Sequence, residues 1–523
     1  MRILVSDSLA EEGVRRLEAA GEVDVITNLS PEELKEKIKD YDALVIRSGT
    51  KVTAEIINAA DRLKVIGRAG VGVDNVDVDA ATRKGIIVLN APGGNTISAA
   101  EHTIAMLLAA SRNIPQANSA LKKGEWNRRK YNGVEVFHKT LGIVGLGRIG
   151  VEVAKRMLSF GMRILAYDPF ITEAKAQELG IRLSTLEEIY RESDFITVHT
   201  PLTPETRNMI DEPQIAMMKP TVRLINCARG GIINEATMAK AVAEGRIAGG
   251  AIDVYTKEPP TGNPLLDQDR IITTPHLGAS TAEAQINVAL AVADQIIAIS
   301  KGELPTTALN MIAVSPETLA LMGPYMDLAE KMGRLVGQLG DSRFEMLEIV
   351  YGGSVAQRDT RIVTVSAIKG LLESIGGSVN FVNASSLLRE RGIKLVESKT
   401  ESANGYSNMI IMTLKTAKES ISVHGTVYGS RDTRIVQINQ FKVYVPTEGN
   451  LVLAVHEDRP NIIGPVCMVL GEDRINIGGM HVGRIEAGQP QLMVLNVDQP
   501  ASEETMKKIC SVSGVVKART IQL

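Results

Sequence analysis

Short apolar runs alternate with polar segments along the first part of the chain. Four runs rich in Ile, Val and Leu have the length and composition of buried strands: 2–7, 43–48, 63–70 and 86–92. Between the first two, "SPEELKEKIKD" is typical of a helix start, with Ser30 as N-cap and Glu33 completing a capping box. Strands that alternate with helices in this way predict a parallel sheet with helices on its faces.

The same alternation begins again after residue 139 and continues to residue 280. A helix is expected before it, over 98–117, because Ser98 and Glu101 form a second capping box ahead of an apolar stretch. A helical run over 281–302 follows. We therefore predict two doubly wound parallel-sheet domains: residues 1–97, completed by 284–303, and residues 98–283.

Beyond residue 304 the pattern changes to helices mixed with longer β-rich stretches, which predicts an α+β intervening domain over 304–448. The last segment, 449–523, has the pattern strand, helix, strand, strand, helix, strand. This βαββαβ order is the ferredoxin-like arrangement, so we expect a fourth domain of that kind.

Composition and charge exclude several classes of protein. Of the 523 residues, 44% are apolar and 23% are charged, as in ordinary globular proteins, and a net charge of −3 gives no basic field for nucleic acid. The cysteines lack the spacing of a zinc site or a disulfide framework. No apolar run approaches the ~18 residues of a membrane span, and the N-terminus turns acidic, unlike a signal peptide. We expect a cytoplasmic protein without a bound metal.

A glycine-rich turn stands near the start of the second unit. The stretch "GIVGLGRIG" places Gly145, Gly147 and Gly150 in the spacing G-x-G-x-x-G, between an expected strand and an expected helix. In this setting the glycines permit a tight turn, close approach of the backbone to a pyrophosphate, and close helix–strand packing. The next strand ends in Asp168, near the spacing of an acid that binds the ribose hydroxyls. Because this carboxylate would repel a 2′-phosphate, the pattern predicts NAD rather than NADP; the alternative is a glycine turn that binds nothing.

Polar side chains follow three further strands of this unit: Arg229 after "LINCA", Glu258 after "GGAIDVY" and His276 after "IITTP". Ligands of open α/β sheets bind beyond the carboxyl ends of the strands. A carboxylate beside an imidazole favours the imidazolium and fixes the tautomer, and a guanidinium suits a substrate carboxylate. Each residue alone has a structural reading, as a solvated arginine, a loop acid or a strand-end histidine. Together they predict a nicotinamide enzyme that moves a hydride and a proton.

Six stretches carry a family resemblance: "RAGVGVDNVD", "NTISAAEHTIAMLLAASRNI", "LGIVGLGRIG", "INCARGGIINE", "GGAIDVYTKEPP" and "TPHLGAST". With them the chain resembles the D-isomer-specific 2-hydroxyacid dehydrogenases, and among these the long-form D-3-phosphoglycerate dehydrogenases, over nearly all of its length. The resemblance implies NAD-dependent oxidation of D-3-phosphoglycerate to 3-phosphohydroxypyruvate, the first step toward L-serine. It also implies that Arg229 anchors the substrate, that His276 is the acid–base and that Glu258 orients it.

The resemblance assigns further residues to the cofactor and the substrate. Those that would line NAD, with Asp253 on the nicotinamide carboxamide, are Thr96, Arg148, Ile149, Thr200, Ala228, Asp253 and Gly278. The backbone of Val71, Gly72 and Val73 would hold the substrate carboxylate together with Arg229. A phosphate favours several arginines. The candidates are Arg47, Arg68 and Arg128, with Arg129 as the competitor of Arg128; "NRRK" is alternatively a solvated or subunit-contact loop.

The terminal segment resembles an ACT domain, an amino-acid-binding module that binds L-serine between paired copies in related dehydrogenases. The resemblance places His456, Asp458 and Asn476 at the ligand positions. The chain departs from the usual pattern at Asn461, where glycine is usual, and at Asp458, where asparagine is usual. Asparagine tolerates a positive φ better than most residues, so the turn at Asn461 is expected to survive. The alternative is an ACT-like domain that only dimerises.

Other functions remain open from the sequence alone. Without the phosphate contacts, the same site would serve another 2-hydroxyacid such as lactate, glycerate or hydroxypyruvate. A different class would be an NAD-binding sensor or scaffold without turnover, against which the complete set of Arg229, Glu258 and His276 argues. The family implies a homotetramer, with the helix from Ser98 and the loop around Trp126 at a subunit contact.

Overall fold

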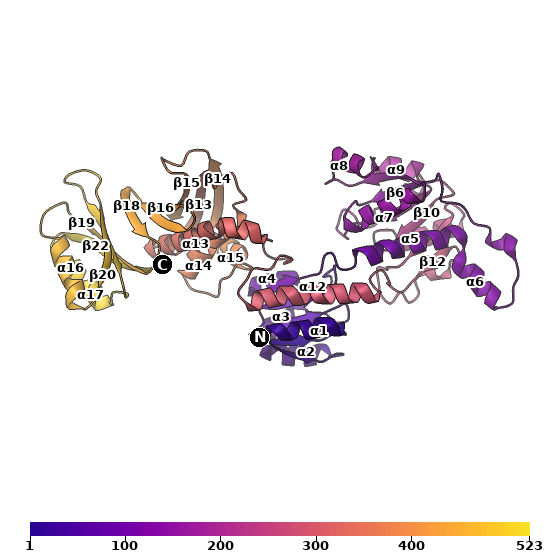
Figure 1. Cartoon of the computed structure of the whole chain (residues 1–523), viewed down its shortest axis with the longest axis horizontal. Helices are drawn as coiled ribbons and strands as arrows, with labels where there is room; N and C mark the ends of the chain where they lie inside the picture. The colour runs from indigo at the N-terminus through magenta and orange to yellow at the C-terminus, as the bar shows by residue number, and fades with distance from the viewer.

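The computed structural model describes residues 1–523, the side chain of Pro316 excepted. Its strands form sheets of five, seven, six and four strands. Figure 1 shows an extended molecule, in which the five-stranded domain with the N-terminus lies at the lower centre and the seven-stranded domain to the right. The two remaining domains follow to the left. The predicted fold class, two parallel α/β sheets followed by an α+β domain and a ferredoxin-like domain, is confirmed.

The first sheet is parallel throughout, in the order β2-β1-β3-β4-β5. Its strands are β1 (Arg2–Val5), β2 (Glu22–Val25), β3 (Ala43–Ile46), β4 (Val65–Arg68) and β5 (Ile87–Leu89). Its helices are α1 (Glu11–Leu17) and α12 (Ala282–Ser300) on one face and α2 (Pro31–Lys37), α3 (Ala54–Ala59) and α4 (Val78–Lys84) on the other. The predicted capping box of α2 is confirmed, since Glu33 N donates to Ser30 Oγ and Ser30 N donates to Glu33 Oε2. Strand β2 is missing from the prediction because "EVDV" is short and half polar.

Helix α12 is long and apolar enough, by length and composition alone, to cross a membrane. This corrects the expectation that no such stretch occurs in the sequence. In the structure Val288, Val292 and Ile296 are buried against Ile3 and Val5 of the first sheet. The apolar composition of α12 is therefore that of a helix covering the core of a domain.

The second sheet is also parallel throughout, in the order β12-β11-β10-β9-β6-β7-β8. Its strands are β6 (Thr140–Val144), β7 (Arg163–Tyr167), β8 (Arg182–Leu183), β9 (Phe195–Val198), β10 (Arg223–Asn226), β11 (Gly249–Ile252) and β12 (Ile271–Thr273). Its covering helices are α5 (Thr96–Arg112), α7 (Arg148–Ser159) and α8 (Glu173–Glu178) on one face, and α9 (Leu186–Glu192), α10 (Glu212–Ile215) and α11 (Glu235–Ala243) on the other. The strand order reverses between β6 and β9, which is where open α/β sheets bind their ligands.

The helix predicted over 98–117 differs from the structure at both ends. It begins at Thr96, and Ser98 Oγ lies 2.7 Å from Oγ1 of Thr281, the N-cap of α12, instead of capping its own helix. It ends at Arg112, because Asn113 takes a positive φ of 53° and a separate helix, α6 (Ile114–Lys122), follows. The Ser98–Thr281 hydrogen bond joins the two segments by which the chain crosses between the first two sheets.

The third sheet has the order β14-β13-β15-β16-β17-β18, with β13 and β14 parallel and the other neighbours antiparallel. Its strands are β13 (Phe344–Gly353), β14 (Lys394–Thr400), β15 (Asn408–Thr416), β16 (Ser420–Tyr428), β17 (Asp432–Ile438) and β18 (Phe441–Pro446). Its helices are α13 (Pro316–Leu339), α14 (Arg361–Glu373) and α15 (Ala384–Glu390). Residues 304–446 thus form an α+β domain.

The last sheet is antiparallel, with the ferredoxin-like order β20-β21-β19-β22. Its elements are β19 (Asn450–His456), α16 (Ile463–Glu472), β20 (Ile477–Gly483), β21 (Gln491–Val497), α17 (Glu503–Ser511) and β22 (Val515–Gln522). Alternate residues of β19 point to opposite sides: Val452 and Ala454 pack under the helices, whereas Leu451 and Leu453 join the core of the third domain. The last two domains therefore share a continuous apolar core.

Glycines in two helices predict opposite stability effects. A Cβ on Gly333, where α13 crosses α14, would lie 2.2 Å from the carbonyl oxygen of Ala367, whereas a Cβ on Gly471 of α16 would have none of the described atoms within 4 Å. We expect Gly333→Ala to destabilise the third domain by about 1–3 kcal/mol through overpacking. Gly471→Ala should be neutral or stabilising by up to about 1 kcal/mol, because alanine favours the helix. Scanning calorimetry compares the two; equal unfolding temperatures would contradict this packing.

Candidate active site

The glycine loop lies between β6 and α7, at the carboxyl edge of the second sheet. Gly145 has a φ of 99°, which a side chain would strain, and a Cβ on Gly150 would lie 2.1 Å from the carbonyl oxygen of Gly145. A Cβ on Gly147 would have none of the described atoms within 4 Å. The first and third glycines are thus required by the backbone itself, whereas Gly147 borders open space at the N-terminus of α7, where an anion is favoured.

The surroundings of this loop fit a dinucleotide. A cavity of about 410 Å³ is lined by residues that include Thr96, Gly147 and Arg148. The carboxylate of Asp168 accepts a hydrogen bond from Leu146 N at 2.8 Å, so the acid after β7 is held against the loop. Close to Gly145, the hydroxyl oxygen of Thr200 is buried and has no partner among the described residues. A buried unpaired hydroxyl at this point is the kind of group that a ligand satisfies.

His276 and Glu258 form a direct pair beyond β12 and β11. Nδ1 of His276 lies 2.9 Å from Oε2 and 3.1 Å from Oε1 of Glu258, and both side chains are about half exposed. A carboxylate only accepts hydrogen bonds, so Nδ1 of His276 carries the proton and Nε2 is left to accept one from a ligand. The predicted imidazole–carboxylate pair is therefore present.

Asp253, at the end of β11, holds the segment that carries His276. Its backbone oxygen accepts from His276 N at 2.9 Å, and its carboxylate accepts from Leu277 N at 2.7 Å and from Gly278 N at 2.9 Å. Thr274 Oγ1 donates to the same carboxylate at 2.6 Å. These bonds fix His276 in the left-handed region, at a φ of 54°, which is uncommon for a residue other than glycine.

Arg229 follows β10, the neighbour of β11 in the sheet, and extends toward the first domain. Its Nε lies 3.3 Å from Oδ2 of Asp74, and a Cβ on Gly72 would lie 2.1 Å from its Nη2. The segment that includes Val71 and Val73 is therefore in contact with this guanidinium. Arg229, Glu258 and His276 emerge from three adjacent strands at one edge, and Arg229 closes the gap to the other sheet.

Arg47 and Arg68 bring further positive charge to this junction from the carboxyl edge of the first sheet. Burial lowers the pKa of the Arg68 guanidinium, and repulsion from Arg229 and Arg47 lowers it further. The buried Nε of Arg68 has no partner among the described residues. Asp7 holds the loop of Arg47 by accepting from Arg47 N at 2.6 Å. An arrangement of guanidinium groups that repel one another and keep an unpaired donor favours a bound anion.

Two sets of predicted residues are not brought together within one chain. Arg128 lies with Arg129 in the exposed turn Arg128–Tyr131 beyond α6, which Figure 1 shows on the far side of the second domain from the first sheet. Neither arginine therefore reaches Arg47 and Arg68 of the same chain.

The predicted effector residues are also separated. His456 ends β19 opposite Gln491, whereas Asn476 precedes β20 at the opposite end of the sheet, beside Asp498. The carboxylate of Asp458 accepts hydrogen bonds from Arg484 and from Gly488 N. Asn461 has a φ of 65°, so the turn that glycine usually forms survives as expected.

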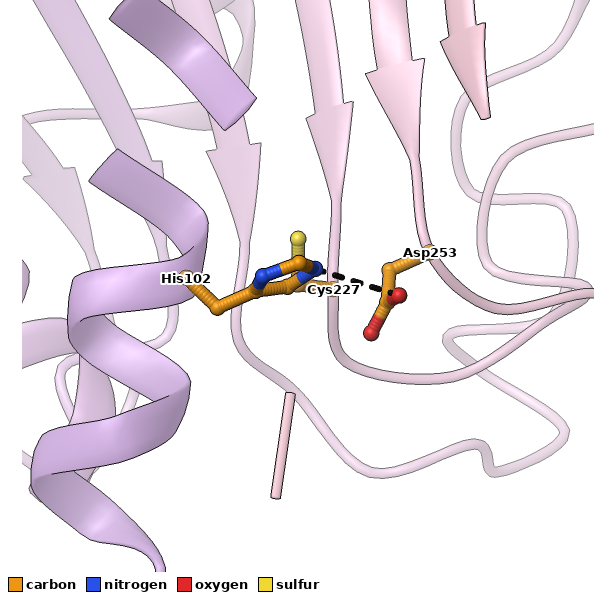
Figure 2. A group of neighbouring side chains, drawn as sticks. All are labelled: His102, Cys227 and Asp253. Atoms are coloured by element: carbon orange, nitrogen blue, oxygen red, sulfur yellow. Dashed lines mark ion pairs between the residues drawn. The ribbon is translucent and has the colours of Figure 1, made fainter. Parts of the chain in front are cut away.

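Figure 2 shows a group that the sequence reasoning missed: His102 of α5 faces Asp253 and Cys227. Nε2 of His102 lies 3.1 Å from Oδ1 of Asp253. The signal in the sequence was a histidine among the small and apolar residues of "SAAEHTIAMLL", within an expected helix. Asp7 and Asp74 are likewise absent from the sequence predictions, because loop acids have no pattern of their own.

Comparison with known proteins decides the family. Residues 104–278 match the model of the D-isomer specific 2-hydroxyacid dehydrogenase NAD binding domain, and residues 321–439 match the D-3-phosphoglycerate dehydrogenase intervening domain. A D-3-phosphoglycerate dehydrogenase of Methanocaldococcus jannaschii is 46% identical over 100% of both chains. This chain belongs to the D-3-phosphoglycerate dehydrogenase branch of the D-isomer-specific 2-hydroxyacid dehydrogenase family. The resemblance stated from the sequence motifs is thereby confirmed.

Other members of the family agree with this. The D-3-phosphoglycerate dehydrogenase of Bacillus subtilis is 42% identical over 100% of this chain and 99% of its own. Among solved structures, the D-lactate dehydrogenase of Aquifex aeolicus complexed with NAD and lactic acid is similar, with a TM-score of 0.52 and 29% identity. The match covers 58% of this chain and 96% of that one. The prediction of an NAD-binding domain in the second unit is confirmed.

The glycine loop yields a prediction that separates binding from folding. Gly147→Ala places a methyl group in open space, so we expect an unchanged unfolding temperature and an about 10-fold weaker affinity for NADH, because the methyl occupies the pyrophosphate position. Gly150→Ala drives its methyl into the Gly145 carbonyl and should destabilise the domain by about 1–3 kcal/mol. Fluorescence titration with NADH and calorimetry measure the two effects. Wild-type NADH affinity in Gly147→Ala would show that the pyrophosphate lies elsewhere.

Proposed function

We propose that this chain oxidises the C2 hydroxyl of D-3-phosphoglycerate with NAD, giving 3-phosphohydroxypyruvate in the biosynthesis of L-serine. The observation that carries the proposal is the His276–Glu258 pair at the edge where Arg229, Arg68 and Arg47 meet. Full-length relatives named D-3-phosphoglycerate dehydrogenase support the same substrate. The substrate has a carboxylate, a hydroxyl and a phosphate, and the site offers a group for each.

His276 is the proton acceptor in this proposal. Since Nδ1–H of His276 donates its hydrogen bond to Glu258, the free Nε2 accepts the proton of the substrate hydroxyl, and Glu258 stabilises the imidazolium that forms. In the reverse direction the same atom returns the proton. The bonds from Asp253 to residues 276–278 keep the imidazole in one position, which lowers the cost of orienting it during the reaction.

The guanidinium groups bind the two ends of the substrate. Arg229 takes the carboxylate, together with the backbone of Val71, Gly72 and Val73, and the substrate then replaces Asp74 as its partner. Arg68 and Arg47 take the phosphate, because Arg68 keeps an unpaired donor and the positive charges of the guanidinium groups repel one another until an anion binds.

The residues of the second domain would hold NAD, which supplies the hydride acceptor when bound. Gly145, Gly147 and Gly150 fit the pyrophosphate, and Asp168 favours the ribose hydroxyls over a 2′-phosphate. Asp253 is assigned to the nicotinamide carboxamide. The other residues proposed to line the cofactor lie at the same edge of the sheet or at the crossing to the first domain: Thr96, Arg148, Ile149, Thr200, Ala228 and Gly278.

A different 2-hydroxyacid is the second candidate, favoured by the similarity to a D-lactate dehydrogenase. Lactate carries no phosphate, and it would leave the buried donor of Arg68 unpaired at a cost of about 1–3 kcal/mol. The phosphorylated substrate is therefore preferred. A sensor without turnover would have no need for the oriented pair of His276 and Glu258.

We further propose a cytoplasmic homotetramer whose ACT domains bind L-serine between paired copies. Because His456 and Asn476 lie at opposite ends of one sheet, a small amino acid touches both only when Asn476 comes from a second copy. The buried Nε2 of His456, which has no partner among the described residues, supports a ligand at this position. The side chain of Trp126, in the loop after α6, is 78% exposed, which supports a subunit contact at this loop. Adding L-serine to the turnover assay tests this regulation.

Turnover of D-3-phosphoglycerate with NAD, followed by the absorbance of NADH, tests the proposed function. His276→Ala should lower kcat by about 100- to 10,000-fold, because general base catalysis is lost, while NADH affinity is retained. Glu258→Gln should lower kcat less, since the ring keeps a hydrogen-bond partner but the imidazolium loses its charge partner. Unchanged turnover in His276→Ala, or no turnover in the wild type, would refute the mechanism.

The phosphate contacts predict a change in substrate preference. Arg47→Ala should raise KM for D-3-phosphoglycerate by about 10- to 100-fold, the effect of losing one hydrogen bond to a charged group, and should leave KM for D-glycerate nearly unchanged. Lys51→Ala, in the same exposed loop, is the matched control and should behave as the wild type. Equal changes for both substrates would place the phosphate away from Arg47.

A further inference from the structure

The carboxylate of Asp253 holds the segment that carries the proposed proton acceptor, His276. The Asp253 side chain is completely buried, and an ionised carboxylate in such a position needs compensating donors and charge. Its oxygens accept from Thr274, Leu277 N and Gly278 N. These donors come from the segment that follows β12, so they tie the carboxylate to that segment alone.

His102 supplies a further hydrogen-bond donor to this carboxylate, from helix α5. Its Nε2 lies 3.1 Å from Oδ1 of Asp253 and 3.3 Å from Oγ1 of Thr274, and its side chain is 18% exposed. The other titratable groups facing Asp253 are Cys227 and Tyr255, and burial raises the pKa of each to about 12, so both stay neutral. Burial by itself would raise the pKa of the Asp253 carboxyl, but the hydrogen bonds from His102, Thr274 and Leu277 N outweigh it and the pKa lies below its ordinary value.

The consequence reaches the active site through the backbone. Asp253 holds His276 N, Leu277 N and Gly278 N, so any shift of the carboxylate moves the segment that presents the imidazole. The left-handed φ of His276 adds to this, since that conformation persists only while the neighbouring bonds enforce it. Figure 2 shows the imidazole of His102 reaching from α5 to the carboxylate of Asp253, with Cys227 beside it.

We infer that His102 is a positioning residue of the dehydrogenase: it holds the Asp253 carboxylate, which in turn sets the pose of residues 276–278. The inference rests on the proposed function for the role of His276. The polar partners of His102 are Asp253 and Thr274, and Thr274 itself donates to Asp253, so the effect of His102 passes through this carboxylate.

A metal ion is the rival explanation of the same cluster, because ligand atoms of His102, Cys227 and Asp253 lie within 4.8 Å of one another. The geometry disfavours it. Both carboxylate oxygens already accept N–H or O–H donors, which would point their hydrogens at a cation. Burial raises the pKa of the Cys227 thiol to about 12, so a metal would also have to displace its proton.

Two substitutions at this position test the inference. His102→Leu removes the donor, whereas His102→Gln places an amide N–H near the position of Nε2; Glu101→Gln, on the exposed side of the same helix, is the control. We expect His102→Leu to lower kcat by about 10- to 100-fold and to weaken NADH binding by about 10-fold, as for the loss of a hydrogen bond to a charged group. KM for D-3-phosphoglycerate should change little. His102→Gln should recover most of the loss, and Glu101→Gln should match the wild type.

The outcomes separate this inference from the alternatives. A folded His102→Leu enzyme with wild-type kcat and NADH affinity would overturn it. A His102→Gln enzyme that is as impaired as His102→Leu would also overturn it, if both variants unfold at lower temperatures than the wild type. That result would show that His102 acts only through its packing in the core. Loss of wild-type activity on treatment with a chelator, restored by Zn²⁺, would assign the cluster to a metal instead. NADH titration needs no substrate, so it tests His102 even if the chain failed to oxidise D-3-phosphoglycerate.

Discussion

Parallel strands end together at one edge of their sheet, and this chain turns two such edges toward each other. The chain crosses between the sheets at two places, which Ser98 and Thr281 join by a hydrogen bond of 2.7 Å. Across the gap, Arg229 of the second domain pairs with Asp74 of the first. The glycine loop, the His276–Glu258 pair and the arginines all follow strand ends, so their proximity is a consequence of the topology and not of any local sequence.

Positive charge at this junction is held in excess, and that excess favours binding of an anion. Arg68 is partly buried next to Arg229 and Arg47, and their positive charges lower the pKa of its guanidinium. Asp74 compensates from the surface, where it is 81% exposed and readily replaced. A ligand with a carboxylate and a phosphate removes the repulsion at both ends, which makes its binding more favourable than that of a neutral molecule of the same shape.

Sequence patterns predicted the sheets and most of the site because they report local chemistry: apolar runs, the capping box at Ser30, the glycine spacing and strand-end polar residues. They failed where partners are distant in the chain. Ser98 was taken for a helix cap, but its hydroxyl bonds Thr281. His102 was not singled out, because its partner Asp253 is 151 residues away. Arg128 and Asn476 matched motifs, yet one chain does not bring them to their expected sites.

Packed contacts connect the C-terminal sheet, through the third domain, to the first domain. Leu451 and Leu453 share a core with the third domain, so that domain and the C-terminal sheet move as one body more readily than as two. The third domain in turn contacts the first, where Asn380 Nδ2 donates to the carbonyl oxygen of Gly85 at 2.7 Å, at the end of α4. That helix covers the sheet from which Arg47 and Arg68 project. The C-terminal domain is therefore linked by packed contacts to the sheet that carries Arg47 and Arg68, and the glycine loop of the second domain is not on that path.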